Sequence, residues 1–394
     1  MSMRVAIIVA RADVALGGAE RSVSEVASAL TEAGCEVNLL AAQGTGQASN
    51  VHLLCSDLSG KRVSLGAFER ALRDHLAQNA YDIIHSVLPF DFADVYQPRG
   101  GTYAETAARN AASYRSLWRR WYKRATALAN LRRARLLRCE RRLCQKPDGP
   151  AIAALSGYVV EQFEKHYGTD RRRITVILNG VNTDKQADPQ QAERLRSQVF
   201  QQLTLGETAD PVLLLFAAHN PRLKGLDSLI RALRLVQKTS ERPPCLVVLG
   251  VGKSDPYRRL AQRLGIEPHV AFLGRTEQVQ DVLAFTDVGI LPTFYDPSSR
   301  FILEALAAGK PVITTRFNGA IDHFTDGRHG RVVDSPDNIA ALADAITYFA
   351  DRTHIEEASQ AIVSDELDAT ISVHRVAREL LDLYQSILAC KPHA

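Results

Sequence analysis

Short apolar runs alternate with amphipathic stretches along the whole chain of 394 residues. Near the start, apolar runs at residues 4–10 and 36–42 flank residues 19–33, whose apolar positions recur at helical spacing. Gly17 and Gly18 supply a turn just before that predicted helix. Strand, glycine turn, helix and strand is the opening unit of a doubly wound parallel sheet.

Further runs typical of buried strands follow in two series, separated by helical patterns. The first series contains residues 81–87, 151–156 and 174–178, and the second contains residues 211–218, 245–250, 270–274, 288–292 and 311–315. Continuous apolar strands between amphipathic helices indicate parallel sheets covered on both faces. Because a chain of this length exceeds what one core usually supports, we predict two Rossmann-like α/β domains.

The loop chemistry between the two series sets the predicted domain boundaries. A polar stretch that begins near Asn179 and Gly180 runs to about residue 210. We therefore expect a first domain at residues 1–183 and a second at residues 184–364. A last helical pattern covers about residues 365–388, after the second series is complete.

Composition excludes several classes of protein. No apolar run approaches the roughly 20 residues that a membrane-spanning helix needs. Residues 5–10 are followed at once by Arg11 and Asp13, so we interpret them as a buried strand and not as a signal peptide. The six cysteines form no CxxC pair and no metal-ligand spacing with histidine, which favours a reducing, cytoplasmic compartment.

Positive charge is concentrated in one segment. The formal net charge is +4, yet residues 113–146 hold twelve Lys or Arg and a single acid, Glu140, together with Trp118 and Trp121. Arginines interleaved with aromatics fit an element at an anionic membrane surface. They also fit the binding of a phosphorylated, lipid-linked acceptor, or an ordinary solvated helix face over a packed apolar stripe. No motif of nucleic-acid-binding proteins accompanies them, so no nucleic-acid partner is expected.

Five loops follow the carboxyl ends of predicted strands, where ligands bind in open α/β sheets. They lie at residues 17–18, 219–224, 250–252, 293–299 and 316–320. The fourth loop carries the most specific chemistry. Ser299 suits the cap of a helix whose first N–H groups would attract a diphosphate. Asp296 before the cap and Glu304 after it are placed to accept hydrogen bonds from sugar hydroxyls.

Residues 296–312 resemble the signature of the retaining GT-B glycosyltransferases of family 4. Asp296 and Glu304 stand with seven residues between them and lead into Ala-Leu-Ala-Ala-Gly-Lys-Pro-Val, with Asp296 in place of the family's usual glutamate. The resemblance implies that Glu304 holds the nucleotide ribose and that Asp296 faces the transferred sugar. Ser299 stands where the family often has a glycine beside the diphosphate, and the adjacent Arg300 is a further candidate donor contact.

The loop at the start of the second domain also resembles the family. Lys224, followed by Gly225, matches a lysine that meets the donor phosphates, a role that suits a point charge. The family often has an arginine five or six residues earlier, where this chain has His219 and Ala218. Arg222 is the candidate replacement.

Glycines and one further arginine complete the donor side that the resemblance implies. Gly250 and Gly252 match the family's glycine pair after a strand, and Arg275 would lie beside the base. In the first domain, Gly17 and Gly18 match the pair whose N–H groups face the donor, although a plain tight turn explains them as well.

The acceptor side is less specific. His85 follows an apolar strand and is either an acceptor contact or a structural histidine, and Asp94 and residues 99–102 are further candidates. Within the family, the Phe-x-Lys-His-Tyr helix at residues 163–167 resembles the glucosyltransferases that act on the first heptose of the lipopolysaccharide core. That resemblance favours UDP-glucose as the donor. It implies a lipid-anchored or envelope saccharide as the acceptor, at the inner face of the cell membrane.

The family resemblance also implies an architecture and a mechanism. Two Rossmann-like domains would face a central cleft, and a C-terminal helix within residues 365–394 would cross back to the first domain. Transfer with retention would let the departing phosphate take the acceptor's proton, so that positioning and charge stabilisation carry the catalysis. The candidate catalytic residues are Lys224, Asp296 and His85. The sequence offers no Asp-x-Asp pair for a metal, so neither a metal nor a cofactor is expected.

Two alternative functions stay open at this point. One is a nucleotide-sugar epimerase built on the same two-domain plan. The other is a non-catalytic sugar-nucleotide sensor or membrane scaffold, which the aspartate at position 296 and the missing arginine before Lys224 keep in consideration.

Overall fold

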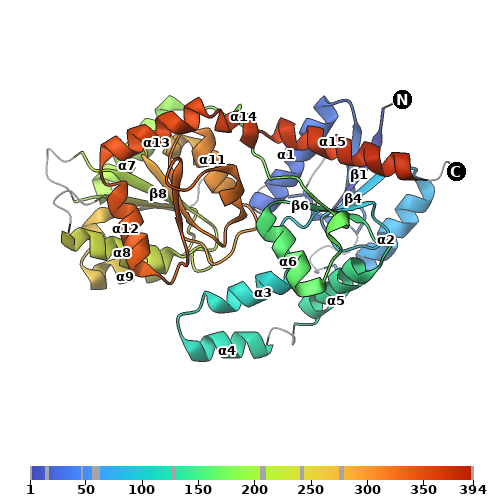
Figure 1. Cartoon of the computed structure of the whole chain (residues 1–394), viewed down its shortest axis with the longest axis horizontal. Coiled ribbons are helices and arrows are strands. Elements are labelled where there is room, and N and C mark those ends of the chain that lie inside the picture. The colour runs from blue at the N-terminus through green and yellow to red at the C-terminus, as the bar shows by residue number, and fades with distance from the viewer. Residues whose placement is uncertain are drawn as a thin grey trace. The chain divides into compact units, whose positions relative to one another are not determined.

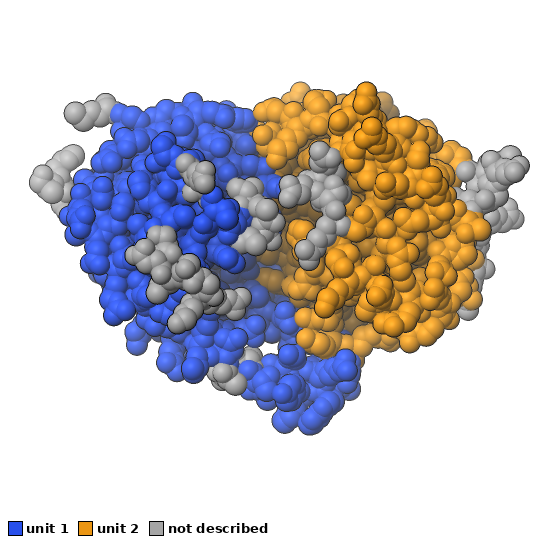
Figure 2. Space-filling model, turned by 180° about the vertical axis from the view of Figure 1, so that it is seen from behind, with its two compact units in different colours: residues 1–111, 116–180, 373–394 blue, residues 112–115, 181–372 orange. Residues whose placement is uncertain are grey.

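The computed structural model describes residues 2–13, 17–45, 48–55, 63–126, 130–204, 210–239, 244–274 and 279–391. The chain divides into two compact units, which Figure 1 shows as ribbons and Figure 2 in separate colours. Unit 1 comprises Met1–Ala111, Ser116–Gly180 and Val373–Ala394, whereas unit 2 comprises Ala112–Arg115 and Val181–Ser372. The chain thus leaves unit 1 after Gly180 and returns to it after Ser372.

A parallel sheet forms the centre of unit 1. Its strands, in the described part of the chain, are β1 (Arg4–Arg11), β2 (Glu36–Gln43), β3 (Val51–Leu53), β4 (Ile83–Ser86), β5 (Val95–Tyr96), β6 (Ala151–Ala154) and β7 (Ile174–Val176), in the order β3-β2-β1-β4-β5-β6-β7. The strand order reverses at β1, which pairs in parallel with both β2 and β4. This doubly wound arrangement confirms the predicted fold class.

Helices cover both faces of that sheet (Figure 1). The described helices of this part of the chain are α1 (Gly18–Glu32), α2 (Leu65–Gln78), α3 (Tyr103–Ala112), α4 (Leu117–Ala125), α5 (Leu131–Gln145), α6 (Gly157–Tyr167) and α15 (Val373–Cys390), of which α4 does not pack on the sheet. Because successive strand residues point to opposite faces, Ile7 packs with α1 and α15, whereas Ile8 packs with Leu72 of α2. The alternating burial explains why the β1 segment is apolar throughout.

Unit 2 repeats the plan with a six-stranded parallel sheet among its described residues. The strands are β8 (Leu213–Ala217), β9 (Cys245–Leu249), β10 (Val270–Gly274), β11 (Val288–Leu291), β12 (Val312–Thr315) and β13 (Gly330–Val333), in the order β10-β9-β8-β11-β12-β13. The helices are α7 (Pro189–Gln202), α8 (Leu226–Thr239), α9 (Asp255–Leu264), α10 (Val279–Leu283), α11 (Arg300–Ala307), α12 (Ile339–Tyr348), α13 (Arg352–Ser364) and α14 (Leu367–Ile371). The predicted second Rossmann-like sheet is confirmed.

Two features of the fold differ from the sequence expectation. The single helix predicted over residues 365–388 is two helices, α14 in unit 2 and α15 in unit 1, which Ser372 separates. Ser372 forms a parallel bridge with Val181, and the Val181 N–H donates to the carbonyl of Ile371. The short strands β3, β5 and β13 were not predicted, since runs of two to four residues leave too little pattern to recognise.

The basic segment divides into two helices with different surroundings. α5 is packed into unit 1, where Glu140 accepts hydrogen bonds from the Tyr96 hydroxyl at 2.8 Å, the Tyr103 N–H at 2.8 Å and the Tyr167 hydroxyl. Burial raises the pKa of Glu140 to about 7, although these donors act in the opposite direction. α4 differs because it has no buried residue. The interpretation as a packed apolar stripe therefore describes α5 but not α4.

Among the described residues, no helix combines the length and the apolar character that a membrane span requires.

Gly225 joins the loop after β8 to α8 and sets a close approach between two segments of unit 2. Its φ is +82°, and a Cβ at this position would stand 1.9 Å from the carbonyl oxygen of Pro292. Gly265 is a matched control, because its φ is +67° but its Cβ would meet nothing within 4 Å.

We expect Gly265→Ala to lower the free energy of unfolding by about 1 kcal/mol, the cost of a left-handed backbone for alanine. Gly225→Ala should cost roughly 3 kcal/mol or more, since the clash with a backbone oxygen adds to that cost. Scanning calorimetry of both variants is the measurement, and equal losses of Tm would contradict the close approach.

Candidate active site

The strand order of unit 2 creates a switch point between β8 and β11. The connection after β8 runs to β9 on one side, whereas β11 lies on the other side of β8. The loops that follow the carboxyl ends of these two strands therefore leave the same edge of the sheet in opposite directions. In open α/β sheets, ligands bind in the crevice at such a point.

Lys224 and Asp296 bring the two switch-point loops together. The Lys224 Nζ lies 2.6 Å from Asp296 Oδ2 and donates a second hydrogen bond to the Tyr295 carbonyl at 2.9 Å. Both side chains of the ion pair are largely buried, at 19% and 13% exposed. An ammonium group is thus fixed at the carboxyl edge of the sheet by a carboxylate from the neighbouring loop.

Further hydrogen bonds, most of them to backbone carbonyls, hold the same two loops together. The Phe294 N–H donates to the Leu223 carbonyl at 2.9 Å, so the turn after β11 packs on the turn that carries Lys224. The Thr293 hydroxyl donates to the Tyr295 carbonyl at 2.9 Å. The Thr315 hydroxyl, from the end of β12, donates to the Thr293 carbonyl at 2.6 Å. These bonds position Asp296 before any ligand binds.

Asn318 joins the loop after β12 to the start of α11. Its Oδ1 accepts hydrogen bonds from the N–H groups of Ser299 and Ala320, each at 3.1 Å, and its side chain is fully buried. Its Nδ2 donates to the Thr314 hydroxyl at 2.9 Å. The sequence placed residues 316–320 in one of the five candidate ligand loops, but it gave no signal of this connecting role, since Ser299 lies 19 residues away along the chain.

Ser299 begins α11 as predicted from its helix-capping character. Its hydroxyl accepts from the Ile302 N–H at 3.5 Å, and the Ser298 N–H donates to Asp296 Oδ1 at 3.2 Å. Asp296 therefore contacts both Lys224 and the turn that leads into the helix. The positive end of α11 and the ammonium group of Lys224 lie on the two sides of one carboxylate.

Arg300 and Glu304 form an ion pair along α11. Arg300 Nη2 lies 3.2 Å from Glu304 Oε1, and the two side chains are only 11% and 7% exposed. Removing one partner of such a buried pair leaves an uncompensated charge, which is strongly destabilising. The pair keeps the Glu304 carboxylate in a fixed position one turn into the helix.

The glycine after β9 allows a second close approach at this edge of the sheet. Gly250 has φ +82°, its N–H donates to the Gly274 carbonyl at 2.6 Å, and a Cβ would stand 3.0 Å from the Ala218 carbonyl oxygen. The loop after β9 therefore lies against the loop after β8. Gly252 is exposed two residues further on, and Arg275 lies outside the described residues.

Arg222 has a different environment from the one expected for a phosphate contact. Its guanidinium hydrogen-bonds the Ser113 hydroxyl and lies over the Tyr114 ring, 3.9 Å from the centroid. Ser113 and Tyr114 belong to the short segment of the basic region that is part of unit 2. The side chain is thus engaged by the basic segment, and its replacement of the family's arginine stays a prediction.

In unit 1, the structure changes the interpretation of His85. Its side chain is 2% exposed, and its Nδ1 lies 2.5 Å from the Tyr384 hydroxyl of α15. Burial, with a smaller contribution from Arg99, lowers the pKa of His85 to about 3, so the ring is neutral at physiological pH. A buried histidine with a partner on the terminal helix is placed to stabilise unit 1, not to contact an acceptor.

The other acceptor-side candidates, Asp94 and Arg99, occupy different positions in unit 1. Asp94 lies at the amino ends of β4 and β5, where Oδ2 accepts from the Ile84 N–H at 2.7 Å and Oδ1 lies 2.8 Å from Lys391 Nζ. That edge is opposite to the ligand edge, so Asp94 is wrong as an acceptor candidate. Arg99 instead donates to Asn179 Oδ1 at 3.0 Å, at the end of unit 1.

Gly17 and Gly18 lie where the first helix begins. α1 starts at Gly18, and Gly17 precedes it in extended backbone, with no side chain capping the helix. This geometry would let a ligand approach the backbone closely. The role of the two N–H groups toward a donor stays a prediction.

A cavity of about 410 Å³ at the carboxyl ends of β1 and β2 was missed by the sequence reasoning. Its polar lining, among the described residues, includes Arg11, Glu20, Gln43, Ser64 and Arg132. These residues come from β1, α1, β2, the turn before α2, and α5. Because their sequence separations are large, no local motif could have indicated that they line one cavity.

Among the residues whose placement is described, no group of three or more His, Cys, Asp or Glu side chains is arranged to hold a metal ion.

Two family models match the chain, one for each unit. The model described as Glycosyltransferase Family 4 matches residues 16–185, and the model described as Glycosyl transferases group 1 matches residues 210–352. The first match covers most of unit 1, and the second contains the switch point, Lys224, Asp296 and Glu304.

Curated relatives are similar over part of their length. The lipopolysaccharide glucosyltransferase WaaG of Escherichia coli (strain K12) is 24% identical over 265 residues, which are 67% of this chain and 67% of that protein. The D-inositol 3-phosphate glycosyltransferase of Streptomyces avermitilis is 32% identical over 207 residues, which are 48% of this chain and 42% of that protein. The chain thus spans less than half of the second relative.

Solved structures share the fold over nearly the whole chain. WaaG, a glycosyltransferase involved in lipopolysaccharide biosynthesis, gives a TM-score of 0.75 at 20% identity and covers 96% of this chain and 99% of its own. Anabaena Alr3699/HepE in complex with UDP-glucose gives 0.70 at 16% identity, over 98% and 100% of the two chains. Because the two family models together match more than half of its residues, this chain belongs to the group 1 and family 4 glycosyltransferases, with the GT-B fold.

Proposed function

We propose that this protein transfers a hexosyl group, with retention, from a nucleoside diphosphate sugar to a saccharide acceptor of lipopolysaccharide or another envelope glycan. The Lys224–Asp296 ion pair at the switch point of unit 2 is the observation that supports binding of the nucleoside diphosphate sugar. A cation held at the carboxyl edge, beside the N-terminus of α11, suits a diphosphate better than it suits a neutral ligand.

The donor we favour is UDP-glucose. WaaG is a lipopolysaccharide glucosyltransferase, and the Alr3699/HepE structure holds UDP-glucose. In this chain, Glu304 would bind the ribose hydroxyls, while Lys224, Ser299 and Arg300 would face the diphosphate. Gly250 and Gly252 would let the backbone approach the nucleotide closely.

The chemistry asks the protein mainly for positioning. The C1–O bond to the diphosphate breaks while the acceptor oxygen forms a bond to C1 on the same face, and the departing phosphate oxygen takes the acceptor's proton. Lys224 and the N–H groups of α11 would stabilise the charge that develops on the diphosphate. Asp296 would orient Lys224 and the transferred hexose. This route needs neither a second carboxylate as nucleophile nor a metal.

The proposed binding of the saccharide acceptor is argued from a cavity in unit 1. The cavity beside β1 and β2 has a size typical of small-ligand sites and combines Arg11, Glu20 and Gln43 with apolar wall residues. We place the saccharide acceptor there. The envelope glycan is favoured because WaaG, which is named for lipopolysaccharide, is similar over two thirds of this chain.

A membrane surface is the proposed location of the reaction. Trp118 and Trp121 on α4 are 68% and 61% exposed, and their rings stack with centroids 5.3 Å apart. Leu117 beside them is 78% exposed. Exposed apolar rings among arginines suit the interface of an anionic bilayer, where each cation near the surface contributes about 1 kcal/mol.

The lysine at the switch point can be tested by UDP binding. We expect Lys224→Ala to weaken UDP affinity roughly 10- to 100-fold, because a hydrogen bond to a charged group contributes about 1.5–3 kcal/mol. Lys310→Ala is the control, since Lys310 precedes β12 at the amino edge of the sheet. Calorimetry measures both affinities, and unchanged UDP binding in Lys224→Ala would remove the phosphate role.

Catalysis can be separated from mere binding by following UDP release from UDP-glucose. The wild type should release UDP slowly by hydrolysis, and faster when a lipopolysaccharide core saccharide is added. Glu304→Ala should reduce release by about 100-fold or more, because the ribose hydroxyls lose hydrogen bonds to a charged group that contribute about 1.5–3 kcal/mol each. Glu356→Gln, at an exposed position of α13, should leave release unchanged. UDP binding without any release would favour the sensor, and release indifferent to acceptor would favour the epimerase.

The membrane interpretation can be tested by flotation with vesicles. The wild type should float with vesicles that contain phosphatidylglycerol and much less with phosphatidylcholine alone. Replacing Trp118 and Trp121 by Ala should weaken the association at least roughly 10-fold, since each buried aromatic contributes about 2 kcal/mol. Val363→Ala on α13, at a position 69% exposed, is the control. Association that ignores both lipid charge and the tryptophans would count against a surface role for α4.

A further inference from the structure

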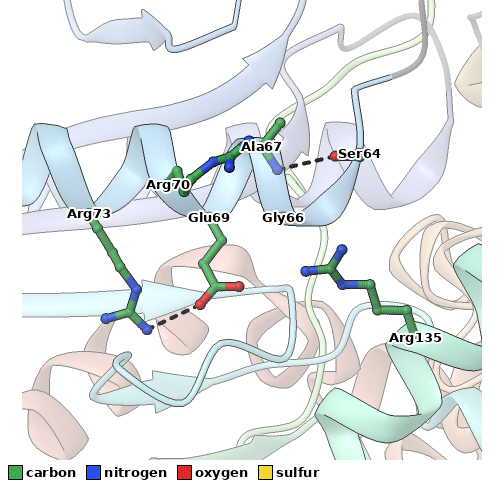
Figure 3. A pocket seen from close by; sticks show the side chains of 7 residues that line it. All are labelled: Ser64, Gly66, Ala67, Glu69, Arg70, Arg73 and Arg135. Carbon is green, nitrogen blue, oxygen red and sulfur yellow. Dashed lines mark hydrogen bonds and ion pairs between the residues drawn. The ribbon is translucent and has the colours of Figure 1, made fainter.

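A second cavity in unit 1, of about 400 Å³, lies between α5 and the flank of α2 that runs from Gly66 to Arg73. Figure 3 shows Arg70, Arg73 and Glu69 on α2 and Arg135 extending from α5 toward the same space. Three guanidinium groups and one carboxylate therefore line a space large enough for a monosaccharide-sized ligand. Nothing in the donor chemistry of unit 2 uses this cavity.

The single carboxylate in the lining is already engaged. Glu69 Oε1 accepts from Arg73 Nη2 at 3.1 Å, and Arg73 also lies 3.7 Å from Asp91. Within the described part of the chain, Arg70 and Arg135 form no ion pair. The cavity thus has a positive charge that the surrounding protein leaves unbalanced.

The position of Arg135 adds to that imbalance. A Cβ built on Gly66 would stand 2.5 Å from Arg135 Nη2 and 2.9 Å from Nη1, so the guanidinium lies directly against the backbone of the first turn of α2. That turn is the positive end of the helix dipole, and it contains no acidic residue. A cation against the positive end of a helix is unfavourable, whereas an anion between the two would be attracted to both.

The cavity is also connected by its lining to the proposed acceptor site. Ser64, the cap of α2, lines this cavity and the one beside β1 and β2. A saccharide in the cavity beside β1 and β2 would therefore have a neighbouring site with guanidinium groups for a substituent that carries negative charge.

We propose that this cavity binds the acidic group, a phosphate monoester or a carboxylate, of an acidic saccharide acceptor. The inference rests on the proposed function, since it specifies the charge of the acceptor for the same transfer. Arg135 and Arg70 bind the acid, and the positive end of the α2 dipole adds to the attraction. An uncharged acceptor of the same shape lacks this contribution.

Two variants test the site in different ways. Arg135→Gln removes one positive charge. Gly66→Ala keeps every charge but fills the space where the Arg135 guanidinium lies, and the backbone there accepts alanine because its φ is not in the left-handed region. Arg141→Gln is the matched control, because Arg141 is exposed on the same helix and lines neither cavity.

The experiment is calorimetry on the full chain with glucose 6-phosphate, glucuronate and glucose as probes, and with UDP in parallel. The wild type should bind one or both acidic sugars at least roughly 10-fold more tightly than glucose, as expected for charge-assisted hydrogen bonds. Arg135→Gln and Gly66→Ala should each lose most of that preference, and Arg141→Gln should keep it. UDP affinity should be the same in all four proteins.

Three results would overturn the inference. Equal losses in Arg135→Gln and Arg141→Gln would indicate general attraction by a basic helix. UDP binding without any preference for acidic sugars would refute the acid site while leaving the proposed function intact, whereas failure of UDP itself to bind would refute the function. If phosphatidylglycerol vesicles, and not the soluble acids, responded to Arg135→Gln and Gly66→Ala, the ligand would be a lipid headgroup and not an acceptor saccharide.

Discussion

The ion pair between Lys224 and Asp296 is the interaction on which the organisation of unit 2 depends. Two loops that leave a parallel sheet in opposite directions are joined by a contact of 2.6 Å between largely buried groups. Removing charges from water is costly, so such a pair persists only where further hydrogen bonds support it. The Tyr295 carbonyl and the Ser298 N–H supply that support. A fixed cation needs little rearrangement when a diphosphate arrives, which is the condition for electrostatic catalysis.

The fold could be predicted from the sequence because the same pattern of strand and helix recurs along the chain. Each buried strand is a continuous apolar run, and each is followed by a helix pattern, so errors in single boundaries do not change the doubly wound arrangement. The start of α11 was accessible for a local reason, since Ser299 is both a capping residue and the end of a polar loop. In contrast, the break at Ser372 has no local signal. It is set by the pairing of Ser372 with Val181, almost two hundred residues away along the chain.

The site could be predicted only where its residues are close in sequence. Asp296, Ser299 and Glu304 lie within one loop and helix, whereas the partner of Lys224 became clear only from the structure. His85 and Tyr384 are separated by 299 residues, so the burial that makes this histidine structural is invisible in the sequence. The two cavities of unit 1 are similar cases, because Arg135 meets Gly66 through the packing of α5 on α2. For the donor residues, the structure gives positions, and their roles stay predictions.

The central claim is that the carboxyl edge of unit 2 binds a sugar joined to a diphosphate. A crystal structure of the protein with UDP-2-fluoroglucose, a donor analogue that resists transfer, tests this claim most directly. The account predicts the diphosphate within hydrogen-bond distance of Lys224 Nζ and of the first N–H groups of α11, with the ribose hydroxyls on Glu304. A nucleotide bound elsewhere, with the Lys224–Asp296 pair and Glu304 untouched, would contradict it.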